Sequence, residues 1–497
     1  AQMRPVINRW ATDIHAQIVC IQWRKNLLAA CFCVVKLNLG HALCPEVLKA
    51  GPRGNFLAKT EAGAILAQTP HHYDQQRHFI GHIYSADPCD SIAQNQFDES
   101  ISIGPSHTMK LANRITALTP GGSDGWEVFY KARALKNSGQ PVIELTIGEH
   151  DIRTHMDILA AMGKSARAGH TGYAAVPGTE NLRATVARRI EAQSGIPTTA
   201  ANILITPGGQ AALFAAHMAV VDFGDTALYC DPFYATYPGT LRGVGAIDKS
   251  VLCKPERDFK PTHQDLNAAA TGARSLLVNS PNNPTGVVYD QATWEGIAKV
   301  CQDHDLWLIS DEVYETQVWQ GTHISPRSLD GMAERTLVIG SMSKSHAMTG
   351  SRVGWVCGPE PVIEHLINLA THTTYGVPGY IQDAADFALN QGVEAEMAVA
   401  APFQRRRQIA MDLIAEQNLI RAVPCSGAMY MMLDIRATGL TGEVFAHSLL
   451  DAKLIAVMPG ESFGQAAAGH ISVAMTVEDS QFKQALEVLL ACSASLN

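Results

Sequence analysis

The feature that most constrains the fold is an alternation, from Met109 onward, of short apolar segments with longer segments of helical periodicity. Helical segments such as residues 210–221 and 291–304 separate most of the apolar ones. Short apolar strands separated by helices imply a mainly parallel sheet that helices cover on both faces, so the predicted fold class is α/β. The predicted strands lie at residues 142–147, 202–205, 226–230, 275–278, 306–309, 336–339 and 352–357.

The pattern changes after about residue 390. A helical region rich in Gln and Arg, residues 403–417, leads to strand-like segments at 427–435 and 470–476 and then to a final helix. This order predicts a smaller α+β domain after the large one. We therefore expect a large domain at residues 154–390, a small domain at 391–497, and an N-terminal arm at 109–153 that joins the small domain.

Residues 1–108 differ in composition from the rest of the chain. They hold 9 Lys and Arg against 8 Asp and Glu, so their net charge of +1 leaves about −10 for the remainder of a chain of net charge −9. They also hold 5 of the 11 cysteines and show no sustained periodicity. An apolar stretch at residues 26–37 only loosely resembles a signal-peptide core, because Lys36 interrupts it. We interpret residues 1–108 as an extension without a fold of its own, poorly ordered or not native.

Composition also restricts the function classes. A net charge of −9 argues against a general nucleic-acid or membrane-surface binder, and no apolar run reaches the length of a membrane span. The cysteines lack the spacing of a disulfide framework or a zinc site. These observations predict a cytoplasmic protein without a metal, a nucleic-acid partner or a membrane partner.

Polar and glycine residues follow several predicted strands, at the sheet edge where such folds bind ligands. After residue 205 comes TPGGQAAL, in which Gly208 and Gly209 open a helix. Backbone N–H groups at a helix N-terminus bind phosphate, although a glycine turn can also serve packing alone. After residue 278 comes NSPNNPTG, a stiff turn that carries Asn283 as a hydrogen-bonding group or as a polar turn residue with nothing bound.

Two further strand ends carry charged side chains. After residue 309 comes SDEVYE, where Asp311 and Tyr314 can share a helical face, or where Asp311 only caps a helix. After residue 339 comes GSMSKSHAMTGSRVGW, in which Lys344 lies among small residues and no acid. Ser341 and Arg352 in this segment can hold an anion.

Together, a phosphate cradle, an acid, a phenol and a buried lysine are the parts that hold pyridoxal 5′-phosphate (PLP). In this interpretation Lys344 forms a Schiff base with the cofactor and Asp311 pairs with its ring nitrogen. Ser341 and Arg352 then meet its phosphate group.

The ordered motifs SPNNPTG, SDEVYE and SKSHAMTGSRVGW resemble those of the class I/II, fold type I, PLP-dependent aminotransferases, over most of residues 109–497. The resemblance implies that Lys344 is the imine lysine and the proton carrier. It also implies that Tyr314 and Asn283 bond the 3-oxygen of the ring and that Tyr234 stacks on the ring face. The remaining implied positions are Gly209 and Gln210 at the phosphate, Gly148 and Asn283 at the substrate, and Tyr173, which would reach the phosphate of a neighbouring subunit in a homodimer.

The chain departs from the family pattern at the position of the substrate clamp. The family uses a C-terminal arginine to hold the substrate carboxylate, whereas GHISVAMTVED places His470 or Ser472 there. Neither residue offers a bidentate guanidinium group. Arg436 is another candidate for the clamp. The family also has Trp before the arginine of the lysine motif, where this chain has Ser351.

We therefore predict an aminotransferase that moves an amino group from an amino acid to a 2-oxo acid in two half-reactions. Two alternatives remain at this stage. One is a PLP-dependent carbon–sulfur β-lyase, which would release pyruvate and a thiol without a 2-oxo acid acceptor. The other is an aminotransferase-like transcription regulator, although residues 1–108 lack a basic face.

Overall fold

The computed structural model describes residues 56–60, 63–67, 109–119 and 125–495, in two units that divide at residues 106 and 107. In the first unit, β1 (Phe56–Thr60) pairs with β2 (Gly63–Ala67) as an antiparallel hairpin. The sequence did not predict this hairpin. The other residues of the predicted extension before Met109 lie outside the described residues, and its interpretation stays a prediction.

The second unit is built around a seven-stranded sheet of order β4–β10–β9–β8–β7–β5–β6. Only β10 runs against its neighbours, with Gly354 opposite both Thr206 and Ser341. The mainly parallel α/β sheet expected from the sequence is confirmed. Its strands are β4 (Ile203–Thr206), β5 (Thr226–Asp231), β6 (Ile247–Leu252), β7 (Ala273–Asn279), β8 (Trp307–Asp311), β9 (Thr336–Ser341) and β10 (Gly354–Cys357).

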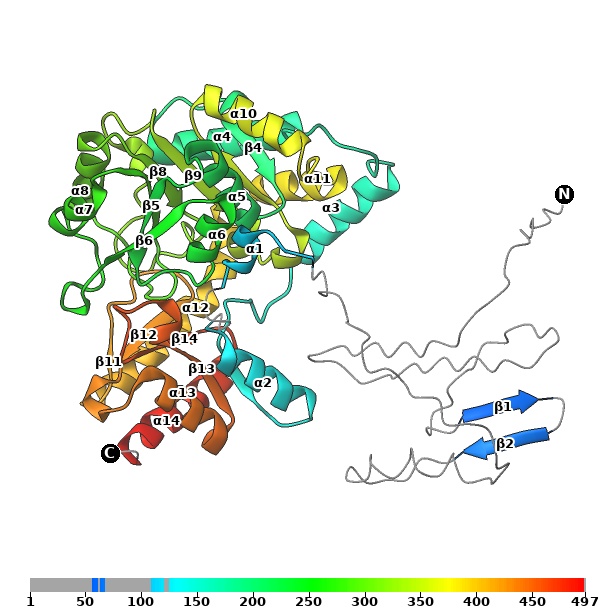
Figure 1. Cartoon of the computed structure of the whole chain (residues 1–497), viewed down its shortest axis with the longest axis vertical. Helices are drawn as coiled ribbons and strands as arrows, with labels where there is room; N and C mark the ends of the chain where they lie inside the picture. Colours follow the sequence, from blue (N-terminus) through cyan, green and yellow to red (C-terminus); the bar gives the residue numbers. More distant parts are fainter. Residues whose placement is uncertain (1–55, 61–62, 68–108, 120–124, 496–497) are drawn as a thin grey trace, which may run out of the picture. The chain divides into compact units, whose positions relative to one another are not determined.

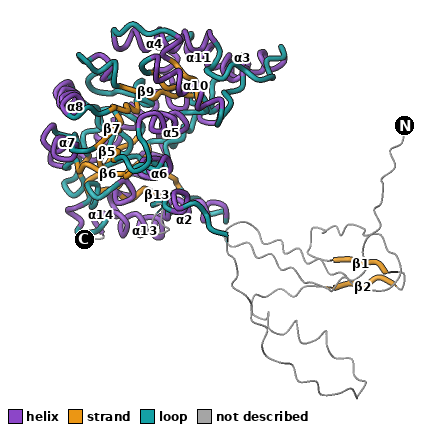
Figure 2. Tube along the Cα trace, turned by 45° about the horizontal axis from the view of Figure 1, so that its top comes forward, coloured by secondary structure: helices purple, strands orange, loops and turns teal. Residues whose placement is uncertain are grey.

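The sequence missed strand β6. This strand lies at the edge of the sheet, and Val251 is its single fully buried residue. An edge strand with most side chains in contact with solvent needs no apolar run, so its sequence, IDKSVL, carries little strand signal. In Figure 2, β5 lies between β7 and the edge strand β6, on the side of helices α7 (His263–Ala270) and α8 (Gln291–Asp303).

Helices cover both faces of this sheet, because successive side chains of the buried strands point to opposite faces. Leu277 and Ile309 pack in a cluster with α5 (Gly209–Val220), α6 (Tyr237–Val244) and α10 (Glu360–Thr371). Their neighbours Leu276 and Leu308 pack in another cluster with α7 and α8. Farther along that second face, a third cluster joins β4 and β10 to α4 (Glu180–Ser194) and α11 (Gly379–Leu389), with α3 (Met156–Arg167) against α11.

A second sheet of five strands has the order β11–β12–β14–β13–β3. Its strands are β11 (Arg421–Ala422), β12 (Tyr430–Asp434), β13 (Ile455–Pro459), β14 (His470–Ala474) and, parallel to β13, β3 (Ile143–Leu145). Helices α2 (Glu127–Asn137), α12 (Val393–Ala415), α13 (Gly442–Lys453) and α14 (Asp479–Ser495) share a core with it. Figure 1 shows α2 among these C-terminal elements. The segment before residue 146 therefore contributes strand β3 to the second sheet and packs helix α2 against it.

Helix α12 begins ten residues earlier than the sequence predicted and contains Pro402. The predicted helix begins at residue 403, just after this proline, whereas the observed helix accommodates it although proline usually breaks a helix. The five-stranded sheet and its helices agree with an α+β domain. The domain boundaries inferred from the sequence stay predictions.

A loop of the second sheet is bonded to the end of β5. Asp231 accepts hydrogen bonds from the backbone N–H of Gln465 (2.9 Å) and of Ala466 (3.2 Å). The backbone N–H of Phe233 also donates to the carbonyl oxygen of Phe463 (2.9 Å). Burial raises the pKa of Asp231 to about 6, and the two amides oppose this rise. The two sheets are therefore joined beside the carboxyl ends of the first sheet.

In the part of the chain that the structure describes, every helix is either too short or too polar to cross a membrane.

Candidate active site

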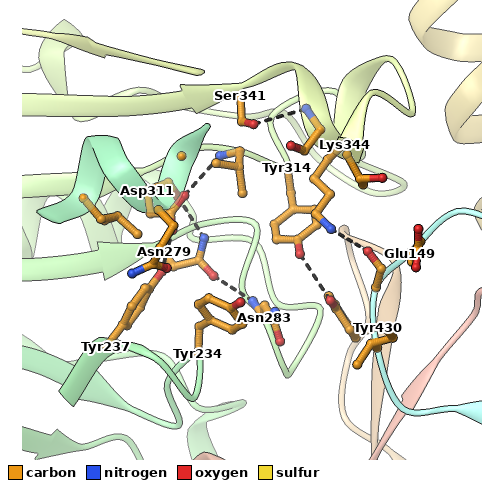
Figure 3. A pocket seen from close by; sticks show the side chains of 18 of the residues that line it. Glu149, Tyr234, Tyr237, Asn279, Asn283, Asp311, Tyr314, Ser341, Lys344 and Tyr430 are labelled. Atoms are coloured by element: carbon orange, nitrogen blue, oxygen red, sulfur yellow. Dashed lines mark hydrogen bonds between the residues drawn. The ribbon is translucent and has the colours of Figure 1, made fainter. Parts of the chain in front are cut away.

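A pocket of about 340 Å³ lies where the carboxyl ends of the first sheet meet the second sheet (Figure 3). It brings together side chains and backbone from strands far apart in the sequence. Ten residues that the sequence singled out line it: Gly148, Gly209, Gln210, Tyr234, Asn283, Asp311, Tyr314, Ser341, Lys344 and Arg352. The strand-end argument therefore located the pocket.

Lys344 lies on the single turn α9 (Met342–Ser345), which begins directly after β9 because the Ser341 hydroxyl accepts from the N–H of Ser343. Its Nζ donates to the carbonyl oxygen of Gly148 at 2.5 Å. Burial and then the charge of Arg352 lower the pKa of Lys344 to about 8, while Glu149 and Asp311 oppose the shift. A large fraction of this amine is thus neutral near pH 8.

Asp311 ends β8 beneath the pocket. One carboxylate oxygen accepts from the Tyr237 hydroxyl at 2.6 Å and the other from the N–H of Val313 at 3.3 Å. Burial raises the pKa of Asp311 to about 6, and the hydrogen bond from Tyr237 opposes this rise. A buried carboxylate held at a fixed position is suited to pair with a protonated ring nitrogen.

Tyr314, Tyr430 and Asn283 form the opposite wall (Figure 3). The Tyr314 hydroxyl donates to the Tyr430 hydroxyl at 3.3 Å, and burial raises the pKa of both phenols. The backbone N–H of Asn283 donates to Asn279 at 2.7 Å, whereas the side-chain oxygen of Asn283 is buried without a partner among the described residues. An unsatisfied buried polar atom in a pocket is expected where a bound group completes the hydrogen bonding.

The glycine turn before α5 faces Arg352. Gly208 has a φ of +87°, and a Cβ at this position would overlap the Arg352 guanidinium, so glycine is required on both grounds. Arg352 also donates to the carbonyl oxygen of Thr349 at 2.7 Å. The first N–H groups of α5 and this guanidinium together form a cradle for an anion of phosphate type.

Gln210 contributes to the cradle through its position at the start of α5. Its side-chain nitrogen donates to the hydroxyl of Thr240 at 2.8 Å, and its side-chain oxygen accepts from the hydroxyl of Thr236 at 3.0 Å. Because the side chain is held in this way, the backbone N–H of Gln210 is the group free to face a ligand.

Several lining residues were not found from the sequence: Trp126, Glu149, Tyr237, Asn279, Tyr430 and Phe463. Most come from segments outside the strand-end motifs, so no local pattern marks them. The exception is Asn279, whose place at the end of β7, four residues before Asn283, was a signal that could have been used. Tyr430 approaches position 148 so closely that this position requires glycine, because a Cβ on Gly148 would overlap the Tyr430 hydroxyl.

The candidates for the carboxylate clamp do not line the pocket. His470 has its Nδ1 beside the carbonyl oxygen of Ala468 and packs its ring on Phe259. Ser472 lies buried in β14, opposite Met432 and Met458. The expectation for Arg436 is corrected: it lies half-exposed at the surface because it pairs with Asp434 at 2.7 Å.

Tyr173 also lies outside the pocket. Its side chain is 91 % exposed and packs edge-to-face on Tyr375, which is 52 % exposed. Two large exposed aromatic rings in contact are suited to a protein interface. The predicted contact of Tyr173 with a neighbouring subunit stays a prediction.

The residues present fit a pyridine ring that carries a phosphate. The anion cradle, the buried acid, the unsatisfied Asn283 and the lysine of lowered pKa surround one pocket at the edge of an α/β sheet. Fold and site together define the class: a fold type I, PLP-dependent enzyme.

Comparison with known proteins assigns the family within this class. The chain matches the family described as aminotransferase class I and II over residues 140–489, and it belongs to that family. It is a PLP-dependent aminotransferase. Neither the lyase nor the regulator considered from the sequence finds support among the relatives.

The relatives span most of this chain. An arginine–pyruvate transaminase from Pseudomonas aeruginosa is 37 % identical over 389 residues, 78 % of this chain and 99 % of that protein. An aspartate/prephenate aminotransferase from Thermus thermophilus is 33 % identical over 382 residues, 76 % of this chain and 97 % of that protein. The solved aspartate aminotransferase from Thermus thermophilus with maleate has a TM-score of 0.72 and 32 % identity, covering 77 % of this chain and all of that one.

Proposed function

We propose that this aminotransferase moves an amino group from an amino acid to a 2-oxo acid in two half-reactions that share the pocket, with Lys344 as the catalytic residue. The observation that carries the proposal is the Lys344 amine, which lies among the carboxyl-end loops with a pKa lowered to about 8. Aminotransferase relatives act on amino acids and oxo acids, and they include an arginine–pyruvate transaminase and an aspartate/prephenate aminotransferase.

Different residues of this chain would hold the cofactor and move the proton. Arg352 and the start of α5 would hold the phosphate group of PLP, and Asp311, which accepts from Tyr237, would place a negative charge against its ring nitrogen. When bound, PLP supplies a carbon for covalent attachment and a ring that withdraws electrons. The neutral Nζ of Lys344 would take the proton from the amino-bearing carbon of a bound substrate. The lowered pKa favours this neutral form.

Replacement of Lys344 by alanine tests the proposal. We expect Lys344→Ala to retain PLP through gel filtration, because the phosphate and ring contacts come from other residues. We also expect it to lose the absorbance of the lysine-bound cofactor and the ability to turn over. Lys483→Ala, at an exposed position of α14, is the control. Near-normal transamination by Lys344→Ala would contradict the assignment. Pyruvate and thiol release without an oxo acid acceptor would favour the lyase instead.

We also propose that the enzyme is a homodimer in which Tyr173 reaches the neighbouring site. The exposed pair of Tyr173 and Tyr375 supports this proposal. Sedimentation of the wild type and of a Tyr173→Asp variant tests it, and a wild type that sediments as a monomer would contradict it. A cytoplasmic location is proposed on the free, buried state of the described cysteines, such as Cys425.

A further inference from the structure

The substrate end of the pocket has an unusual charge balance for an enzyme of amino acids. Among the described residues that line the pocket, the cations are Lys344 and Arg352, and the acids are Glu149 and Asp311. An α-amino acid brings a carboxylate into the pocket, and an acidic amino acid brings two. The side chains that are free to meet the substrate therefore decide which donors are favoured.

Both cations are committed to other partners. The Arg352 guanidinium lies against Gly208 in the phosphate cradle and donates to the carbonyl oxygen of Thr349. Lys344 is the group that exchanges with the donor. The described lining thus leaves no guanidinium or ammonium group for a carboxylate of the substrate. Arg436 does not line the pocket and pairs with Asp434, and Ser472, at the clamp position, does not line it either.

Of the two acids, Asp311 is occupied by Tyr237 beneath the ring site, whereas Glu149 is available. Glu149 follows Gly148, whose carbonyl oxygen accepts from Lys344 Nζ. Figure 3 shows Glu149 near the lysine amine, at the end of the pocket opposite Asp311. Among the charged groups near Lys344, Glu149 exerts the largest effect on the pKa of its amine.

The existing partner of Glu149 is weak. Arg153 lies 3.7 Å away, and the side chains of Arg153 and Glu149 are 82 % and 50 % exposed. An exposed ion pair of this kind contributes little, so a substrate cation can displace Arg153 at small cost.

We propose that the preferred amino donor carries a second, cationic group that binds the carboxylate of Glu149. This inference rests on the proposed function of the pocket and names its substrate class. The class consists of amino compounds with a distal ammonium or guanidinium, as in basic amino acids and diamines. Glutamate and aspartate, which place a second negative charge near Glu149, are the disfavoured donors.

The test compares matched donors with the PLP-loaded enzyme in single half-reactions, followed by the absorbance of the cofactor. Ornithine and norvaline have side chains with the same carbon chain and differ by the distal ammonium, and glutamate supplies the opposite charge. We expect kcat/KM for ornithine to exceed that for norvaline by at least about fivefold, with glutamate the poorest, and the ratio to fall as salt is added.

Two variants test whether the preference for ornithine depends on the carboxylate of Glu149. Glu149→Gln should lower the ratio of ornithine to norvaline by about three- to fivefold. Glu487→Gln is the matched control, because Glu487 forms an i,i+4 pair with Lys483 at 3.9 Å and is 51 % exposed, away from the pocket. As a readout that does not require the cation itself to react, n-butylguanidinium should inhibit better than valerate in the wild type, and this difference should shrink in Glu149→Gln.

The test separates results that contradict the role of Glu149 from results that contradict the proposed aminotransferase function. If norvaline and the other donors react but ornithine has no advantage, or if Glu149→Gln leaves the ratio unchanged, the inference is wrong and the aminotransferase assignment stands. A preference for glutamate would also overturn it, since a group outside the described lining would then hold the carboxylate. If no amino donor changes the cofactor absorbance, the proposed function fails and this inference fails with it.

Discussion

Replacing Lys344 by methionine should stabilise the cofactor-free protein at neutral pH. At pH 7 the lysine is charged in both the folded and the unfolded chain, and the folded pocket disfavours that charge. A pKa lowered from 10.5 to about 8 corresponds to roughly 3 kcal/mol of unfavourable free energy. Loss of the hydrogen bond to Gly148 removes about 1–2 kcal/mol of stabilisation. The expected net gain for Lys344→Met is therefore about 1–2 kcal/mol.

The stability difference between Lys344→Met and the wild type should depend on pH. Above pH 8 the folded chain holds Lys344 neutral, while the unfolded chain stays charged up to about pH 10.5. The unfolded state then binds more protons, so the stability of the wild type rises with pH across this interval. The wild type regains this roughly 3 kcal/mol between pH 8 and 10.5. The advantage of Lys344→Met should therefore vanish within that interval and become a disadvantage of about 1–2 kcal/mol above it, because the hydrogen bond to Gly148 is still lost.

Urea denaturation of the cofactor-free proteins at a fixed concentration, at pH 7 and at pH 10.5, measures both expectations. Lys483→Met is the control, because its side chain is 57 % exposed on α14 and should show no comparable gain at pH 7. A Lys344→Met protein that is less stable than the wild type at pH 7 would refute the reasoning. An advantage that does not change with pH would refute it as well.

Three further substitutions test the pocket. Gly148→Ala should lower kcat at least about tenfold while PLP stays bound, because the new Cβ displaces the Tyr430 hydroxyl; unchanged kcat would contradict this. Tyr237→Phe removes a donor from Asp311, so the pKa of that carboxyl should rise further and the acid limb of the pH–kcat/KM profile should move up by about 0.7 pH units. Ser472→Arg should raise kcat/KM for neutral amino acids by about tenfold if the guanidinium reaches the pocket, and no gain would show that the carboxylate is held elsewhere.

The sequence predicted those site residues that lie where a strand ends. Asp311 ends a buried strand, and Lys344 and Asn283 lie within four residues after the end of one. Parallel strands bring their carboxyl ends to one edge of the sheet. Local sequence therefore sufficed for them. Glu149 and Tyr430 come from the segments around the second sheet, and their place in the pocket depends on how the two sheets meet. No local pattern encodes that contact.

The same distinction applies to the fold. Buried strands such as β7 and β8 are apolar on both faces, and the sequence predicted them. The edge strand β6 was missed because most of its side chains are exposed and polar, so it has no apolar run. The sequence did not predict the reversed direction of β10, which depends on its chain connection and not on its composition. Arg436 was a plausible clamp by its position after β12, but Asp434, two residues away, is the partner that it finds.

The bonds at Asp231 restrict how the pocket can open. Two amides of the 464–466 loop and the link from Phe233 to Phe463 fasten the second sheet to the end of β5, and Phe463 itself lines the pocket. A separation of the two sheets at this point would break three hydrogen bonds together. Any opening that preserves them must rotate the second sheet about this corner, so the corner acts as a pivot. The N–H groups of Gly427 and Ala428, just before β12, also donate to the carbonyl oxygens of Gly286 and Gln317 at 2.8 Å. The second sheet is therefore held to loops of the first beside Tyr430 as well, and the pocket can open there only if these bonds break.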